Sequence, residues 1–345
     1  MDMGESDSQD IASQDIAQES PAQHVFIAPS LDQEAILAGA SYTHHSAIPE
    51  IVTENSSTEC VLGVDEAGRG PVLGPMVYAL LYVPLTQHRS LLAQTHRFDD
   101  SKVLTPTFRS SLMKTLCTPG TDLFQHCGWA TRVMSARDIG SAMLRPAGTY
   151  NLNAQAMDAT IDLIKDVFAK GINVREIYID TIGSPAVYQK KLERIFPTTM
   201  ITVAKKADSL YPCVSAASVC AKVTRDAALE VCYQTYASVA DAQEEPQTAA
   251  EGWGSGYPSD ARCTTWLKEH VDPLFGWGSE CRFSWGTAKD LLEAKGTRVD
   301  WPVEDDDEQG MRVTDFFSAR PDGETEKETN ELTTWFGRPV AEEVF

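Results

Sequence analysis

Four acidic side chains follow short apolar segments of the type that forms buried strands. They are Asp65 and Glu66 after the segment 61–64, Asp180 at the end of the segment 176–180, and Asp208 after the segment 200–204. One such acid is most often part of a turn or a cap, but carboxylates gathered at one site cannot all stay ionised without cations. Oxygen ligands of this kind suit Mg²⁺ or Mn²⁺, and two ions around a phosphodiester stabilise both the attacking and the leaving oxygen. The pattern therefore predicts a divalent-metal site for phosphodiester chemistry.

A glycine-rich segment continues directly from the first two acids. Gly68 and Gly70 flank Arg69; such glycines let a backbone approach a ligand closely, and the arginine adds charge. A dinucleotide-binding fingerprint is disfavoured, because the next glycine is Gly74 and prolines at 71 and 75 spoil the helix start. No Gly-Lys-Ser or Gly-Lys-Thr occurs, which excludes a P-loop. Taken alone, the segment fits a plain Gly/Pro turn equally well.

The segments that carry these residues have the order of a mixed α/β fold. Strands are predicted at 60–64, 76–83, 124–130, 176–180 and 200–204, and helices at 151–170, 185–196, 214–231, 264–270 and 285–294. The first of these helices has apolar residues at helical spacing and stops at Gly171, a typical C-terminal signal. Strands come first and helices then alternate with strands, which predicts a mixed sheet with helices on its faces.

The net charge of −21 is concentrated at the two ends of the 345-residue chain. Residues 1–60 hold 11 acidic and no basic residues, 298–345 hold 14 acidic and 5 basic, and 61–297 hold 25 acidic and 24 basic. The whole-chain charge is therefore a poor guide to partners. We expect a disordered acidic tail over 1–58, a catalytic domain over 59–240, a helical extension over 241–297, and an acidic, largely disordered tail over 298–345.

Composition disfavours several classes of protein. The longest apolar run, 77–85, is interrupted by Pro84 and is too short to cross a bilayer. No Lys or Arg precedes Arg69, so neither a signal peptide nor an Arg-rich transit peptide is expected. None of the eight cysteines stands in a C-x-x-C pair, which indicates reduced thiols and not a zinc site or a disulfide framework.

Residues 64–75, Val-Asp-Glu-Ala-Gly-Arg-Gly-Pro-Val-Leu-Gly-Pro, resemble the signature of type 2 ribonucleases H, the ribonuclease HII family. Further motifs of the family follow in order at 100–102, 150–153, 178–183, 206–208, 211–226 and 254–258. The resemblance covers about residues 60–295 and is greatest to the catalytic chain of the eukaryotic three-subunit enzymes. It implies a ribonuclease H-like fold, a five-stranded mixed sheet flanked by helices, with a helical C-terminal extension.

The resemblance also implies an activity. Such an enzyme hydrolyses RNA in RNA/DNA hybrids and cuts on the 5′ side of ribonucleotides embedded in duplex DNA, leaving 3′-hydroxyl and 5′-phosphate ends. The four acids would be the catalytic residues and would hold two divalent ions, Mg²⁺ or Mn²⁺. By the same resemblance we expect a heterotrimer with two non-catalytic subunits in the nucleus. There it would act in ribonucleotide removal and RNA primer removal during DNA replication and repair.

Other residues acquire roles only through the resemblance. The backbone of Gly68, Arg69 and Gly70 would read ribose 2′-hydroxyls, and Tyr257 would recognise the RNA–DNA junction by stacking on the deoxyribose. Three further positions match contacts to backbone phosphates or sugars: Lys102, Asn151 and Arg225. Without the resemblance, these three fit a solvated lysine, a helix-cap asparagine and a surface arginine equally well.

The acidic tail contains one apolar motif. Val313 precedes the aromatic pair Phe316 and Phe317 by three positions, which resembles a peptide that binds the replication sliding clamp, although the usual glutamine is out of register at Gln309. Two adjacent phenylalanines in a polar tail need a surface to bind, and the clamp and the chain's own partner subunits are the two candidates. A non-catalytic scaffold on the clamp is the alternative function, and the four intact acids argue against it.

Overall fold

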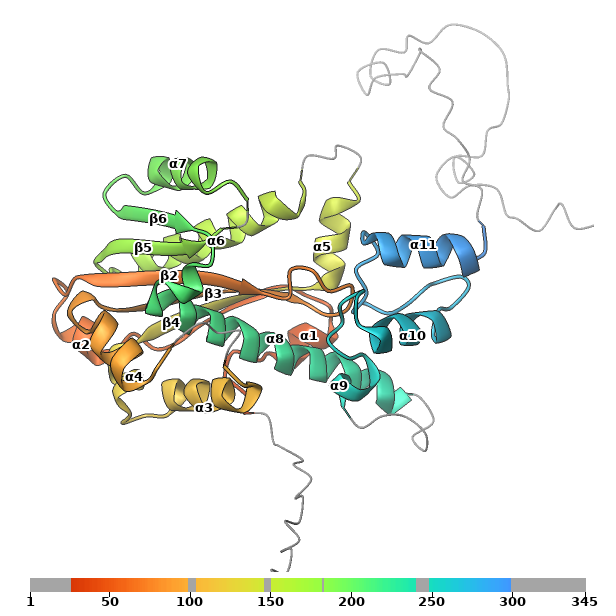
Figure 1. Cartoon of the computed structure of the whole chain (residues 1–345), viewed down its shortest axis with the longest axis horizontal. Coiled ribbons are helices and arrows are strands. Elements are labelled where there is room, and N and C mark those ends of the chain that lie inside the picture. The colour runs from red at the N-terminus through yellow and green to blue at the C-terminus, as the bar shows by residue number, and fades with distance from the viewer. Residues whose placement is uncertain (1–25, 99–103, 146–149, 182, 240–247, 299–345) are drawn as a thin grey trace, which may run out of the picture. The chain divides into compact units, whose positions relative to one another are not determined.

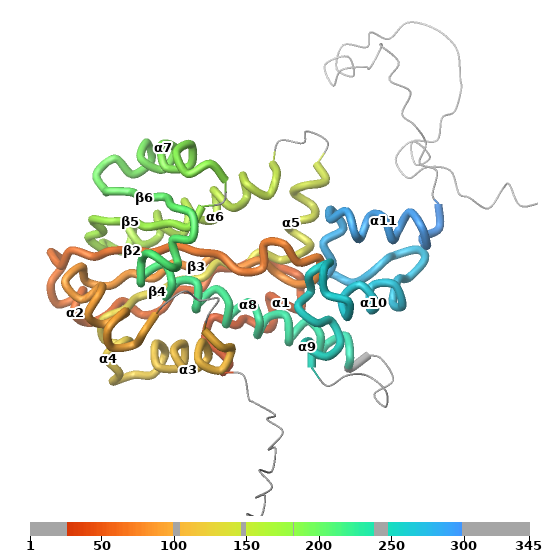
Figure 2. Tube along the Cα trace, in the orientation of Figure 1, coloured from red at the N-terminus to blue at the C-terminus, as the bar shows by residue number. Residues whose placement is uncertain are grey.

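A six-stranded mixed sheet forms the centre of the protein (Figure 1). The computed structural model describes residues 26–98, 104–145, 150–181, 183–239 and 248–298. The strands are β1 Tyr42–His45, β2 Cys60–Ala67, β3 Met76–Pro84, β4 Gly128–Met134, β5 Val174–Asp180 and β6 Met200–Ala204. Their order is β1-β4-β3-β2-β5-β6, and Figure 2 labels β2 to β6 along the tube. Neighbours from β1 to β2 pair antiparallel, whereas β2, β5 and β6 are parallel.

Helices cover both faces of this sheet. The helices are α1 Gln33–Leu37, α2 Glu50–Glu54, α3 Pro106–Cys117, α4 Asp122–His126, α5 Ala136–Met143, α6 Leu152–Ala169, α7 Pro185–Ile195, α8 Pro212–Val239, α9 Ala249–Gly252, α10 Ala261–Glu269 and α11 Gly286–Lys295, with the short 3₁₀ helices η1 Leu85–Gln87 and η3 Ala207–Ser209 and the π-helix η2 His88–Thr95. Successive residues of a strand point to opposite faces, and Val61 and Leu81 accordingly pack with α3 and α8 in one apolar cluster. Leu62 and Leu80 pack with α6 and α7 in a second cluster. The predicted mixed sheet with helices on its faces is therefore confirmed.

Helix α6 illustrates how local sequence sets these elements. The Asn151 side chain accepts hydrogen bonds from the N–H groups of Asn153 and Ala154 and so caps the helix. The helix ends before Gly171, whose φ of +78° suits glycine best. Both boundaries agree with the prediction.

The C-terminal extension packs on the end of α8. Trp253, Trp266 and Trp277 are buried in a third apolar cluster together with Tyr233 of α8. All eight cysteines are free thiols. Among the described residues, no helix is long and apolar enough to cross a membrane.

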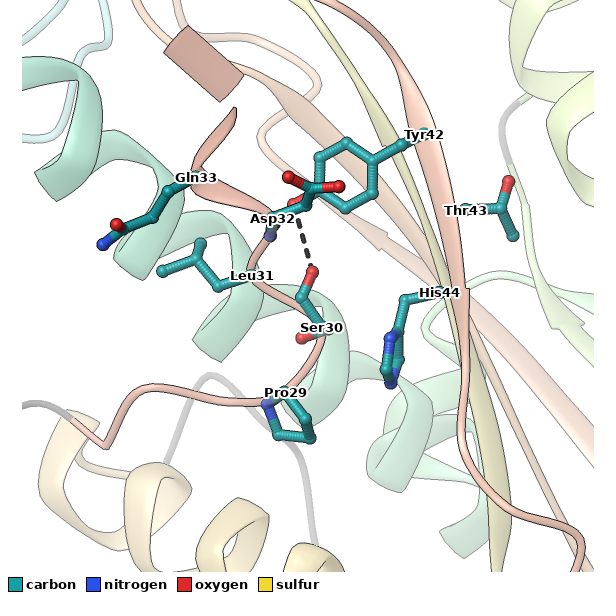
Figure 3. A pocket seen from close by; sticks show the side chains of 8 residues that line it. All are labelled: Pro29, Ser30, Leu31, Asp32, Gln33, Tyr42, Thr43 and His44. Atoms are coloured by element: carbon teal, nitrogen blue, oxygen red, sulfur yellow. Dashed lines mark hydrogen bonds between the residues drawn. The ribbon is translucent and has the colours of Figure 1, made fainter. Parts of the chain in front are cut away.

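The N-terminal segment corrects one prediction. We predicted disorder over 1–58, but residues 26–58 form α1, β1 and α2, and β1 pairs with β4 as a sixth strand; residues 1–25 lie outside the described part. Figure 3 shows residues 29–33 beside β1, where the Tyr42 hydroxyl donates to the Ser30 carbonyl at 3.0 Å. The Ser30 hydroxyl is also hydrogen-bonded to Thr224 of α8 at 2.8 Å. Partners far along the chain thus order a segment that has no strand period of its own.

A second correction concerns the strand predicted at 124–130. The chain forms the short helix α4 there first, because the Thr121 side chain accepts from the N–H of Phe124 and caps it. Strand β4 begins only at Gly128. The capping threonine outweighs the β-type composition of the residues that follow it.

Candidate active site

The four predicted acids line one pocket of about 470 Å³ at an edge of the sheet. Strands β2 and β5 are parallel with Val64 beside Ile179, so Asp65 and Asp180 follow at the same level. Asp180 pairs in turn with Ala204 of β6, and Asp208 lies in η3 just beyond that strand. Parallel strands present their carboxyl ends at the same edge, which is why acids distant in sequence meet here.

A turn after β6 brings Asp208 toward Asp180. Lys206 has a left-handed backbone, with φ +56°, and the chain then enters η3. The N–H of Ala207 donates to Oδ1 of Asp180 at 3.0 Å. A left-handed lysine is uncommon, and such strain is concentrated at functional sites. This turn therefore fixes the spacing of two of the four acids.

Asp65 lies in a poorly solvated part of the pocket. It is only 6% exposed, and burial raises its pKa to about 7, with the charges of Asp180 and Asp208 acting in the same direction. Hydrogen bonds from the Ser218 hydroxyl and from the N–H of Glu66 (2.8 Å) oppose that rise in pKa. The carboxylates therefore crowd each other, and a bound cation would relieve the repulsion.

Helix α8 lies close enough to β2 to supply Ser218 because of Gly63. A Cβ atom at Gly63 would lie 2.3 Å from the backbone of Cys213, in the first turn of α8. Any larger residue would push the helix away from the strand. Gly63 thus sets the distance between the strand that carries Asp65 and the helix that carries Ser218.

The four carboxylates of the pocket fit a divalent ion that completes its coordination with water and substrate. Among the described residues, no three Asp, Glu, His or Cys side chains are already arranged as a cage for a metal ion. Mg²⁺ usually takes only one or two carboxylates from the protein and completes its shell with water and substrate phosphate. Four carboxylates that line one pocket supply such oxygen ligands, so the residues fit Mg²⁺ or Mn²⁺.

Residues 68–70, here called the glycine loop, form one continuous surface of the pocket with Tyr257. Gly68 has φ +76°, and a Cβ atom at Gly70 would lie 2.9 Å from Cε1 of Tyr257. Tyr257 is 38% exposed at the pocket rim. The structure therefore brings together Gly68, Arg69, Gly70 and Tyr257 beside the acids.

Two residues that the sequence analysis missed hold the glycine loop in place. Arg282, fully buried, donates to the carbonyl oxygens of Gly68 (2.6 Å), Arg69 (3.0 Å) and Gly74 (3.1 Å). Trp285 Nε1 donates to the Gly70 carbonyl at 3.0 Å, and the Arg282 guanidinium lies 4.8 Å from the Trp285 ring centre. Burial lowers the pKa of Arg282 to about 9, so it stays charged at neutral pH. The C-terminal extension thus orients the peptide groups of the loop.

Arg225 and Asn151 have structural partners. Arg225 is only 7% exposed and donates to the Ser255 carbonyl (2.7 Å) and to Oδ1 of Asp226 (3.2 Å). The interpretation of Arg225 as a surface arginine is therefore wrong, because it anchors the segment that carries Tyr257. Asn151 caps α6, which confirms the cap interpretation.

Contacts of Arg225 and Asn151 with a substrate stay predictions. Lys102 lies outside the described residues, as do Val313, Phe316 and Phe317. The structure places the acids, the glycine loop and Tyr257 at one pocket, and the roles of these residues toward metal, substrate and partners stay predictions.

Known proteins identify the family. The family model "Ribonuclease HII" matches residues 62–288, so the chain belongs to the ribonuclease HII family, and it is an endoribonuclease. Proteins named as the A subunit of ribonuclease H2 are similar to it over most of their length. The one from Neurospora crassa is 58% identical over 93% of this chain and 97% of its own, and the one from Homo sapiens is 43% identical over 76% and 85%.

Solved structures confirm the ribonuclease H-like fold. The ribonuclease H2 from Pyrococcus horikoshii has a TM-score of 0.54 and 27% identity, covering 68% of this chain and 98% of that one. The ribonuclease HII of the PCNA:RNase HII complex from Archaeoglobus fulgidus has a TM-score of 0.52 and 25% identity, covering 67% and 96%. The predicted five-stranded sheet is corrected to six, since β1 is added at the edge.

Proposed function

We propose that this chain is the catalytic component of a ribonuclease H2 that cuts RNA in RNA/DNA hybrids and single ribonucleotides embedded in duplex DNA. The observation that supports this most is the pocket itself. Four acids, a glycine loop and an exposed tyrosine line the same hollow. Acids alone would suit any metal-dependent nuclease, whereas the loop and the tyrosine give the pocket a means of choosing the sugar.

In this proposal the four acids of the pocket carry the metal ions that the reaction needs. Asp65, Glu66, Asp180 and Asp208 would hold two divalent ions, Mg²⁺ or Mn²⁺, and family membership implies such ions. When bound, the ions would supply an activated water and stabilise the departing oxygen. The cut falls on the 5′ side of the ribonucleotide and leaves 3′-hydroxyl and 5′-phosphate ends.

Sugar recognition falls to the glycine loop. Arg282 and Trp285 engage the carbonyl groups of Gly68, Arg69 and Gly70, so the peptide planes of the loop are fixed before a substrate arrives. A preorganised backbone can bind a ribose 2′-hydroxyl without rearranging, whereas a deoxyribose offers it no partner. Tyr257, packed against Gly70, would stack on the deoxyribose that follows the ribonucleotide.

Relatives that are named as one subunit of ribonuclease H2 imply that the chain works with other subunits. We propose two non-catalytic subunits, and place their docking surface on the C-terminal extension. Phe275, 80% exposed, stands beside Leu274 on a turn where the Asp272 carboxylate accepts from both N–H groups at 2.8 Å. Two adjacent exposed apolar side chains on a hydrogen-bonded turn offer a partner an apolar contact.

We further propose that the enzyme acts in the nucleus, in ribonucleotide and RNA primer removal during DNA replication and repair. We keep the region 59–240 as the catalytic domain and 241–297 as the extension; residues 1–25 and 299–345 lie outside the described part of the chain. Clamp binding by Val313, Phe316 and Phe317 stays a proposal, and the archaeal relative solved in complex with PCNA supports it.

A panel of substrates tests the proposed function. The chain, assembled with the subunits it binds, is given three duplexes with Mg²⁺: a continuous RNA/DNA hybrid, DNA with one ribonucleotide, and DNA alone. We expect cleavage of the first two and none of the third. Tyr257→Phe should impair the single-ribonucleotide substrate more than the hybrid. Cleavage of plain DNA at a similar rate would refute sugar recognition by this pocket.

A further inference from the structure

Asn153, in the first turn of helix α6, is hydrogen-bonded to the glycine loop. The Arg69 guanidinium donates through Nη2 to Oδ1 of Asn153. A guanidinium only donates hydrogen bonds, so the amide oxygen of Asn153 must face it. Asn153 belongs to the motif 150–153 of the family resemblance, but the resemblance implies no role for it. The contact gives this side chain a definite orientation toward the loop.

The backbone of Asn153 is held by the capped start of α6. Oδ1 of Asn151 accepts from the N–H of Asn153 at 3.0 Å and from that of Ala154 at 3.1 Å. The Gln155 side chain, only 2% exposed, donates to the Tyr150 carbonyl at 3.4 Å. The following turns of α6 belong to the second apolar cluster. Asn153 itself is exposed, but its amide is presented from a firmly anchored helix start.

Arg69 is held at both its backbone and its side chain. Its carbonyl oxygen accepts from the buried Arg282 at 3.0 Å. Its Nη1 donates to the hydroxyl of Tyr78, a buried residue of β3, at 3.5 Å, while Nη2 donates to Asn153. Glycines on both sides leave the backbone of the loop permissive, so these contacts on Arg69 restrict a segment whose own sequence does not.

We propose that Asn153 is a positioning residue for the glycine loop, which holds the Arg69 side chain and thereby fixes the peptide groups that contact the ribose. This inference rests on the proposed function. A loop that is already ordered can bind a 2′-hydroxyl without first losing conformational freedom, and it keeps the scissile bond in register with the acids. The carbonyl contacts of Arg282 and the side-chain contact of Asn153 therefore act together on one residue of the loop.

A neutral acceptor suits this position. An aspartate could accept from Arg69 through a stronger, charge-assisted hydrogen bond. It would also place another carboxylate near the four acids and near the phosphates of an incoming strand, where like charges repel. Asparagine offers the same oxygen at the same reach without the charge. The choice of Asn over Asp is what an orienting contact beside an anionic substrate requires, and it provides a test.

A double-mutant cycle tests whether Asn153 acts through Arg69. The full chain, assembled with the subunits it binds, is assayed on a duplex with one ribonucleotide in Mg²⁺ as wild type, Asn153→Leu, Arg69→Met and the double variant. Displacements of about 1 Å cost up to about 100-fold in rate, and the loop keeps its carbonyl contacts, so Asn153→Leu should lower kcat/KM about tenfold. The double variant should match Arg69→Met alone, because two residues that act as a unit are not additive. Additive losses would show that Asn153 acts elsewhere and would overturn the inference.

Two further variants separate positioning from a general structural effect. Asn153→Asp keeps the oxygen acceptor, so kcat should stay near wild type while the added charge raises KM. Asn55→Leu removes another exposed asparagine, whose Oδ1 accepts from the N–H of Ser57 at 3.1 Å, and it should keep the wild-type kcat/KM. The inference is refuted if Asn153→Asp loses most of its kcat, an outcome that decides the question even if Asn153→Leu does not fold. An equal loss in Asn55→Leu also refutes it.

The outcomes distinguish this inference from the proposed function. If the wild type cuts at the ribonucleotide and spares plain DNA, but Asn153→Leu matches its kcat/KM, only the positioning role is refuted. If the wild type cuts plain DNA at a similar rate, or cuts neither duplex, sugar recognition by the pocket is refuted and the positioning role with it.

Discussion

Replacing Gly68 by alanine tests the glycine loop with a control that the chain itself provides. Gly68 has φ +76°, and a Cβ atom there would lie 2.7 Å from the Pro75 carbonyl oxygen and 3.1 Å from Cγ of Arg225. Gly171, after α6, has φ +78°, and a Cβ atom there would meet no atom of the described residues within 4 Å. Both substitutions carry the same backbone cost, and only Gly68→Ala adds a clash.

The magnitudes follow from these contacts. A left-handed backbone costs an alanine about 1–2 kcal/mol relative to glycine, so Gly171→Ala should lower the free energy of unfolding by that amount. The contact with Pro75 involves backbone and cannot be relieved by a rotamer change, which adds about 1–3 kcal/mol of overpacking. The methyl group points at Pro75 and Arg225, so we expect Gly68→Ala to displace the loop that we propose reads the ribose.

Urea unfolding and cleavage kinetics measure the two effects. Gly68→Ala should lose more stability than Gly171→Ala, and its kcat/KM on a single-ribonucleotide duplex should fall by about 10- to 100-fold, since displacements on the order of 1 Å have such effects. Gly171→Ala should keep the wild-type kcat/KM. The reasoning is refuted if the two variants match in both stability and kcat/KM.

Three further predictions concern other parts of the structure. Arg282→Met leaves the carbonyls of Gly68, Arg69 and Gly74 without their donor, so urea unfolding should show a loss of about 3 kcal/mol or more; a loss below about 1 kcal/mol would contradict the contacts. Burial lowers the pKa of His88 to about 4, and its Nε2 accepts from the N–H of Cys213 at the start of α8. Because the unfolded chain takes up this proton first, the stability is full above about pH 6.5 and is lost as the pH falls toward about 4. Between about pH 7.5 and pH 5, the free energy of unfolding of His88→Gln should therefore fall by about 2 kcal/mol less than that of the wild type. An equal fall in both proteins would disprove this role of His88. Phe316→Ala combined with Phe317→Ala should abolish binding of the purified sliding clamp in calorimetry and leave nuclease activity unchanged; loss of partner subunits with normal clamp binding would assign the motif to assembly.

Much of the gathering of the acids in the pocket could be predicted because its signals are local. Asp65 and Asp180 each follow an apolar strand, and parallel pairing of β2 with β5 brings the two ends together. The cap at Asn151 and the stop at Gly171 likewise depend only on neighbouring residues. Such local signals predict the structure correctly here, because the elements that they specify are the ones that the folded chain contains.

The remaining features depend on partners far along the chain. Arg282 holds carbonyls far earlier in the sequence, with a separation of 208 residues to Gly74, and no spacing rule links them. Strand β1 owes its order to its pairing with β4, and the burial of its residues shows no alternation. From the sequence, Arg225 fits a surface arginine or a substrate contact, whereas in the structure it is buried and hydrogen-bonded to the Ser255 carbonyl, 30 residues further along the chain. In each case the decisive contact is tertiary, and it overrides weak local preference.

The most direct test of the account compares Asp180→Asn with Asp162→Asn. Asp162 is an exposed acid of α6 and serves as the control for loss of one negative charge. Both variants, assembled with the subunits that the chain binds, are assayed on a duplex with one ribonucleotide in Mg²⁺, and the product ends are mapped. Asp162→Asn should cut on the 5′ side of the ribonucleotide at the wild-type rate, whereas Asp180→Asn should fold normally and lose nearly all cleavage, as expected when several kcal/mol of charge stabilisation disappears. Substantial Mg²⁺-dependent cleavage by purified Asp180→Asn would contradict the assignment of this pocket as the active site.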